Sequence, residues 1–168
     1  MDARIAALVP LVYPLDPSAV FVYRQWPVSQ FSTGCVADGP PTHGVVMTLW
    51  PDRATLVVDS LPLATQLRAV PAGLWLSRMA ARVRTDRWTF TAEQCTGIPE
   101  LYARGVTVHR NPAPSVGGTP GRAELVVRLD GTEQRYDTPD ALNPYMSWLG
   151  AVWQELDRCA GSPWSTPR

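Results

Sequence analysis

The side chains that could carry out chemistry are few and widely spaced. The two histidines are His43, in the turn-like segment GPPTHG, and His109, just before Asn111. Neither belongs to an H-x-x-x-H pattern or follows a C-x-x-C pair, so the sequence predicts no metal site. Cys95 and His109 could form a thiolate–imidazole pair, because their spacing does not forbid it. A buried small thiol and a histidine at the end of a strand are the favoured interpretation.

Motifs of nucleotide binding and acyl transfer are also missing from the sequence. It contains no G-x-S-x-G elbow, no Walker loop and no dinucleotide fingerprint, and its carboxylates do not form a clear acid–base pair. We therefore expect no cofactor and favour a non-enzymatic protein. The alternative is a small enzyme or ligand-binding protein, with a pocket between two repeats that is lined by Cys95, Tyr102 or His109.

The three cysteines, Cys35, Cys95 and Cys159, are an odd number at wide spacing. This arrangement is not typical of a secreted disulfide framework and predicts reduced, dispensable thiols. The first fourteen residues, MDARIAALVPLVYP, are too short and too interrupted by proline for a membrane-spanning helix, and no signal-peptide cleavage site follows them. We expect a cytoplasmic protein, or a virion protein if the chain comes from a phage.

The composition is that of one globular domain over residues 1–168. The chain has a mass of 18.5 kDa and is 45% hydrophobic, which is enough for a core. Fifteen arginines balance fifteen acidic residues and there is no lysine, so the formal net charge is zero. This balance disfavours a strongly basic nucleic-acid-binding protein. Scarce Lys, Ile and Asn indicate a high-GC genome, bacterial or phage.

Internal similarity suggests a duplicated unit. The segment PDRATLVV at 51–58 shares six of eight residues with PGRAELVV at 120–127. Residues 71–83 likewise resemble 144–156, which aligns Trp75 with Trp148. We expect two pseudo-equivalent repeats, at about 19–84 and 88–158, with the two tryptophans as matching core residues. Truncation of either to alanine should then lower the free energy of unfolding by roughly 3–5 kcal/mol.

Hydrophobic periodicity places strands and helices within these repeats. The segments 75–83 and 144–156 have an apolar helical face, and the first twelve residues could add a short helix. Residues 92–104 read as one or two helical turns ended by Gly105, and 111–121 and 161–168 read as irregular. The strands are predicted at 19–26, 45–50, 54–59, 88–91, 106–109, 123–129 and 132–137. The segments Pro51-Asp52-Arg53 and Asp130-Gly131 predict hairpins between the strands that flank them, and Asn143 is the predicted N-cap ahead of Pro144. Alternation within 123–129 should point Leu125 and Val127 to one face and Glu124 to the other.

These elements predict an α+β fold. We expect an antiparallel sheet built from two pseudo-twofold-related βββα repeats, with the amphipathic helices of both repeats packed on one sheet face.

Arginines on the first repeat helix form the candidate interaction surface. Arg78 and Arg82 share a helix flank, and Arg84 and Arg87 extend the cluster beyond the helix. Residues 1–84 carry seven arginines and five acids, a net charge of +2, whereas residues 85–168 carry eight arginines and ten acids, a net charge of −2. Solvated helix faces explain this pattern, but so does an acidic partner. That partner could be the acidic second helix of another copy, with Glu155 and Asp157.

The function predicted from these features is protein binding. The sequence favours an adaptor, immunity protein, secretion chaperone or phage assembly component, because tryptophan and arginine are enriched at binding hot spots. Trp164, in the irregular tail, is a further candidate contact. We expect a protein partner or self-association, and neither membrane nor nucleic-acid binding.

Overall fold

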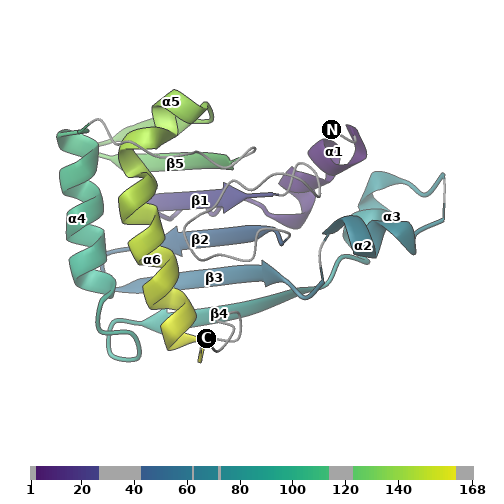
Figure 1. Cartoon of the computed structure of the whole chain (residues 1–168), viewed down its shortest axis with the longest axis horizontal. Coiled ribbons are helices and arrows are strands. Elements are labelled where there is room, and N and C mark those ends of the chain that lie inside the picture. The colour runs from purple at the N-terminus through teal and green to yellow at the C-terminus, as the bar shows by residue number, and fades with distance from the viewer. Residues whose placement is uncertain (1–2, 27–42, 62, 72, 114–122, 162–168) are drawn as a thin grey trace.

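The fold is α+β and is built on one antiparallel sheet (Figure 1). The structure, a computed structural model, describes residues 3–26, 43–61, 63–71, 73–113 and 123–161. Six strands pair in the order β4-β3-β2-β1-β5-β6, and every neighbouring pair is antiparallel. The strands are β1 (Phe21–Gln25), β2 (Val45–Leu49), β3 (Arg53–Asp59), β4 (Thr85–Thr91), β5 (Ala123–Leu129) and β6 (Thr132–Tyr136).

Helices lie on both sides of this sheet. The two long ones, α4 and α6, run side by side across one face, while α1, α2 and α3 gather beyond one end of the strands (Figure 1). The helices are α1 (Ala3–Val12), α2 (Leu63–Arg68), α3 (Leu76–Ala80), α4 (Ile98–Arg110), α5 (Pro139–Leu142), the 3-10 turn η1 (Asn143–Tyr145) and α6 (Met146–Cys159).

We call the face under α4 and α6 the α4–α6 side. Alternate strand residues such as Phe21, Leu56 and Leu125 point to it and form the larger buried cluster with the helices. Trp148 packs edge-on against Phe21 with 4.9 Å between ring centroids, and its indole Nε1 donates a 2.8 Å hydrogen bond to the backbone oxygen of Leu101. This indole therefore joins α6 to both the sheet and α4.

The opposite face, the α1–α3 side, has a smaller apolar cluster. Val22, Val46 and Val57 point to it and pack with residues of α1 and α2, including Val9 and Leu63. Farther along the sheet, towards β6, this side carries ion pairs instead of apolar contacts. They are Arg24–Glu124, Arg135–Glu124, Arg135–Glu133 and Arg128–Glu133.

The two predicted hairpins are confirmed. β2 and β3 pair through the turn at Pro51 and Asp52, and β5 pairs with β6 through Asp130 and Gly131. Asp130 and Gly131 have φ of 53° and 74°, as the tight two-residue turn between twisted strands requires. The helix predicted at 144–156 is present as α6, and the N-terminal helix is present as α1.

The strand predicted at 106–109 is wrong, because those residues belong to α4. The helix does not end at Gly105 but continues to Arg110. Gly105 lies inside it because α4 approaches Trp148 closely: a Cβ on this residue would be 2.4 Å from Trp148 Cζ2. The glycine thus permits close packing of α4 on α6 and does not stop the helix.

The structure does not confirm the internal duplication. The first similar segment forms the second strand of its hairpin (β3), whereas its counterpart leads into the first strand of the other hairpin (β5). The helices that were expected to match also lie on different sides of the sheet: α6 packs on the α4–α6 side, while α3 contacts α1 and is followed by Val83, which packs in the smaller cluster. The expectation of both helices on one face is therefore wrong.

Candidate protein-binding surface

The segment between β3 and β4 carries the arginines singled out in the sequence. α2 spans six residues and α3 only five, so neither is long enough to cover the sheet. Gly73 has φ of 89°, a conformation that favours glycine, and it lies between the two helices. Met79 is the buried residue of α3, and this helix contacts α1. Met79 thus packs against the rest of the protein, while Leu76, Ser77 and Arg78 are exposed.

Trp75 is on the exposed part, which contradicts its predicted role in the core. The residue precedes α3 in an extended conformation, and 76% of it is accessible to solvent, against 3% for Trp148. Leu76 is 39% exposed, and Leu61, just before α2, is 56% exposed. The shortness of α3 explains the error, because its single buried turn is formed around Met79 and leaves the residues at its start outside.

Three arginines lie close to these apolar residues along the chain. Arg78, Arg82 and Arg84 are exposed, and no ion pair of theirs occurs among the described residues. The amide of Arg78 donates to the backbone oxygen of Trp75 at 2.9 Å, so the two residues are one turn apart. We call Leu61, Trp75, Leu76, Arg78, Arg82 and Arg84 together the α3 surface.

A glutamine fixes one edge of the α3 surface. Gln66 Nε2 donates to the backbone oxygens of Leu61 and Arg84, at 2.8 and 3.1 Å, and its Oε1 accepts from the Arg84 amide at 2.7 Å. The amide of Ser60 also donates to the Arg84 oxygen at 3.1 Å. These bonds hold the start and the end of the β3–β4 connection together, and with them Leu61 and Arg84.

Two further residues, Arg87 and Trp164, are predicted contacts of a partner. Arg87 is exposed on the edge strand β4 and pairs across from Val57, so its side chain points to the α1–α3 side. Asp86, the adjacent acid, points to the other face. Trp164 lies outside the described residues, so its predicted contact stays a prediction.

The acidic residues of α6 do not form the free surface that self-association would need. Glu155 is held by Arg158, with Nη2 2.7 Å from Oε1, and by the Gly97 amide at 3.1 Å. Asp157 is buried. In this structure, therefore, Glu155 is already paired and Asp157 does not lie at the surface.

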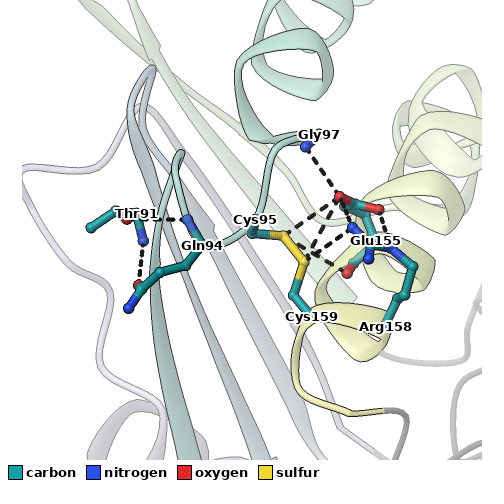
Figure 2. The surroundings of a disulfide bond; sticks show 7 residues. All are labelled: Thr91, Gln94, Cys95, Gly97, Glu155, Arg158 and Cys159. Carbon is teal, nitrogen blue, oxygen red and sulfur yellow. Dashed lines mark hydrogen bonds and ion pairs between the residues drawn. A yellow bond between two sulfur atoms is a disulfide. The ribbon is translucent and has the colours of Figure 1, made fainter.

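Cys95 and Cys159 form a disulfide, which contradicts the prediction of reduced thiols (Figure 2). The bond links the turn after β4 to the last residue of α6 across 64 positions. The sequence did not reveal it because the fold brings the two residues together, whereas their spacing fits no motif. Cys35 lies outside the described residues.

The Cys95–His109 pair is also wrong. The two residues flank opposite ends of α4, and the sulfur of Cys95 is bonded to Cys159. His109 Nδ1 instead lies 3.1 Å from the hydroxyl of Tyr145 and 3.4 Å from that of Tyr136. Tyr102 packs on Phe21 with 5.8 Å between ring centroids and so belongs to the core of the α4–α6 side.

A buried carboxylate that the sequence did not single out fastens α1 to the sheet. Asp59, at the end of β3, accepts hydrogen bonds from the hydroxyl of Tyr13 and from the Gly44 amide, the latter at 2.7 Å. His43 Nδ1 donates to the Asp59 backbone oxygen at 2.7 Å. Burial raises the pKa of Asp59 to about 6, although the bonds from Tyr13 and Gly44 lower it. Burial also raises the pKa of Tyr13.

One sequence signal could have revealed the exposed tryptophan. Pro71 and Gly73 interrupt the segment just before Trp75, and a strand begins at Thr85, which leaves room for only a short helix. A helix of this length cannot bury four apolar residues on one sheet face.

Within the described residues, no helix combines the length and the apolar character needed to cross a lipid bilayer. No protein-family model, curated protein or solved structure matches this chain.

Proposed function

We propose that this chain is a non-enzymatic protein-binding module and that the α3 surface is its docking site. The observation that carries this proposal is the exposure of Trp75 beside a set of arginines. A tryptophan that is three-quarters exposed is uncommon on a free surface, and tryptophan and arginine are the side chains most enriched at binding hot spots.

The chemistry of the surface defines the partner. The arginines around Trp75 and Leu76 favour a protein with an acidic surface, because opposite potentials steer association and fix orientation. The exposed indole needs an apolar pocket or groove on that protein. Since Glu155 and Asp157 are not free, the partner is a different protein and not the acidic helix of a second copy.

Charge reversal tests the electrostatic part of the proposal. The partner is captured from the native host on the wild-type chain, and association rates are then measured against ionic strength. Arg78→Glu with Arg82→Glu should slow association by about tenfold or more at low salt, and the difference should shrink as salt screens the charges. The control variant is Arg104→Glu, a reversal of an exposed α4 arginine that has no ion pair among the described residues, and it should associate like the wild type.

Truncation of the indole tests the apolar part. Trp75→Ala should weaken binding by roughly 30-fold, the effect of a hot-spot residue worth about 2 kcal/mol, mainly through faster dissociation. Equal affinity for this variant, together with equal rates and salt slopes for the arginine variants, would show that the α3 surface is solvated and unoccupied. A monomeric mass by light scattering is expected, and a stable homo-oligomer lost on Trp75→Ala would contradict the choice of a foreign partner.

A further inference from the structure

A second cluster, formed by the turn before α4 and the end of α6, combines three groups that can bind Zn²⁺. Cys95 lies in the turn before α4, while Glu155 and Cys159 are four residues apart on α6 and share one face of it. Their ligand atoms all lie within 4.8 Å of one another (Figure 2). We propose that reduction of the Cys95–Cys159 disulfide converts this cluster into a Zn²⁺ site with two thiolates and one carboxylate as ligands.

The distances fit a tetrahedral ion. Glu155 Oε1 lies 3.6 Å from Cys95 Sγ and 3.8 Å from Cys159 Sγ. With Zn–S of about 2.3 Å and Zn–O of about 2.0 Å, a tetrahedral angle separates sulfur from oxygen by about 3.5 Å. The carboxylate is therefore already near a ligand position relative to both sulfurs. Only the sulfurs must move, from bonded contact to the separation of about 3.8 Å that the same geometry requires.

The surroundings favour the ionised form of each ligand. Hydrogen bonds from Arg158 lower the pKa of the Glu155 carboxyl, and the Gly97 amide also donates to this group. Arg158 Nη2 is 3.6 Å from Cys159 Sγ, and Cys95 precedes the N-terminus of the 13-residue helix α4. A guanidinium and a helix N-terminus both stabilise a nearby thiolate.

The charges of the reduced site also balance with zinc bound. Two thiolates and the Glu155 carboxylate carry three negative charges, and Arg158 supplies one positive charge. A divalent cation brings the sum to zero, whereas the empty dithiolate would leave an excess of negative charge beside the buried Cys95. Glu155 and Arg158 are three residues apart on α6, and the Arg158 side chain is exposed. The guanidinium can therefore move away from the Glu155 oxygen that binds zinc and still stay near the site.

The redox step is a thiol–disulfide exchange with a dithiol reductant. A thiolate of the reductant attacks Cys159 Sγ, the more accessible sulfur, and the Cys95 sulfur leaves as a thiolate. The second thiol of the reductant then displaces Cys159, so the reductant becomes a disulfide and the protein gains two electrons and two protons. Zn²⁺ displaces the thiol protons, and a water molecule takes the fourth position. The disulfide and the metal are mutually exclusive.

Metal titration of the full chain tests this proposal. The protein carries Cys35→Ser to remove the third thiol and is reduced with a phosphine, which leaves no competing thiol in solution. We expect one Zn²⁺ per reduced chain, none per oxidised chain, and a cysteine-to-Co²⁺ charge-transfer band when Co²⁺ replaces zinc. Absence of zinc binding by the reduced, folded chain would overturn the proposal.

Variants test whether the three residues form one defined zinc site or whether the two thiols alone bind the metal. Cys95→Ser or Cys159→Ser should abolish the Co²⁺ band, and Glu155→Gln should weaken Zn²⁺ binding by about 100-fold or more, because loss of an outer-shell group alone can cost up to about 100-fold and Glu155 is a direct ligand. Unchanged affinity of Glu155→Gln would exclude the carboxylate as a ligand and reject the site. Circular dichroism monitors folding, and zinc should raise the melting temperature of the reduced chain but not of the oxidised one.

Discussion

The two sides of the sheet are covered in different ways. On the α4–α6 side, two helices of 13 and 14 residues lie across the strands. A disulfide joins the turn before α4 to the last residue of α6. On the α1–α3 side, short helices gather near one end of the strands, and buried or half-buried polar groups replace much of the apolar packing. Trp148 is buried on the first side, and Trp75 is exposed beside the second.

This contrast shows that helix length decides what an apolar pattern can bury. A helix of 14 residues extends over about 20 Å and can cross several strands, whereas five residues extend over about 8 Å. The long helix stabilises the fold by covering the sheet, whereas the short helix leaves side chains exposed and available to a partner. Substitutions on the two sides should therefore differ in their effect on stability.

Trp148→Ala should have the largest effect on stability. The substitution removes a buried indole and its hydrogen bond to Leu101, and it should lower the free energy of unfolding by roughly 3–5 kcal/mol. Chemical denaturation followed by circular dichroism measures the change. The conservative control, Trp148→Phe, should lose less, and a loss below about 1 kcal/mol for the alanine variant would show that the α4–α6 side does not provide most of the stability.

Loss of the disulfide should be the next largest effect. Cys95→Ser with Cys159→Ser should lower the free energy of unfolding by roughly 2–4 kcal/mol, because the bond closes a long loop in the unfolded chain. Chemical denaturation of the oxidised proteins measures the change. Cys35→Ser is the control for loss of a thiol, and an equal change for both variants would contradict a specific role of the cross-link.

Asp59 should make the α1–α3 side sensitive to pH. Its folded-state pKa of about 6 lies above its ordinary value, so its stabilising contribution is complete at low pH and is lost as the pH rises through about 6. Between about pH 7 and pH 4, the wild type should gain up to about 3 kcal/mol relative to Asp59→Asn. Denaturation at several pH values measures this difference. Parallel profiles for the two proteins would mean that the carboxylate does not titrate in this range.

Trp75→Ala should have the smallest effect on folding. The side chain is mostly exposed, so the free energy of unfolding should change by less than about 1 kcal/mol, in contrast to Trp148→Ala. The same denaturation experiment compares the two variants directly. A loss of several kcal/mol would place the Trp75 indole in a packed environment and remove the main support for the α3 surface.

Much of the sheet could be predicted from short-range patterns. Alternation in 123–129 correctly predicted that Leu125 and Val127 share one face and that Glu124 lies on the other, where it pairs with Arg24. Asp130-Gly131 predicted the hairpin, because the turn depends on backbone conformations that these residues favour. The candidate arginines were identified from helical spacing, but α3 is shorter than that spacing assumes: Arg78 lies in α3, whereas Arg82 follows its end at Ala80.

The errors concern contacts between distant parts of the chain. Gly105 resembled a helix end, but its role depends on Trp148, which is 43 positions away. The cap expected at Asn143 was also misplaced: this residue lies within the turn η1, and Thr138 caps the preceding helix α5 through its side chain. Local rules correctly identified the residues that favour turns and caps here, but not the element that each one serves.

The sequence by itself determined most of the strands, their two tight hairpins, the long C-terminal helix and the basic character of the segment between β3 and β4. These features follow from neighbours a few residues apart, whose periodicity and turn preferences are local. Only the tertiary structure decided the strand order, the pairing of Cys95 with Cys159, the burial of Asp59 against Tyr13 and the different environments of Trp75 and Trp148. Each of these depends on which surfaces meet in space, and the same apolar pattern is buried or exposed according to the partner surface that the fold provides.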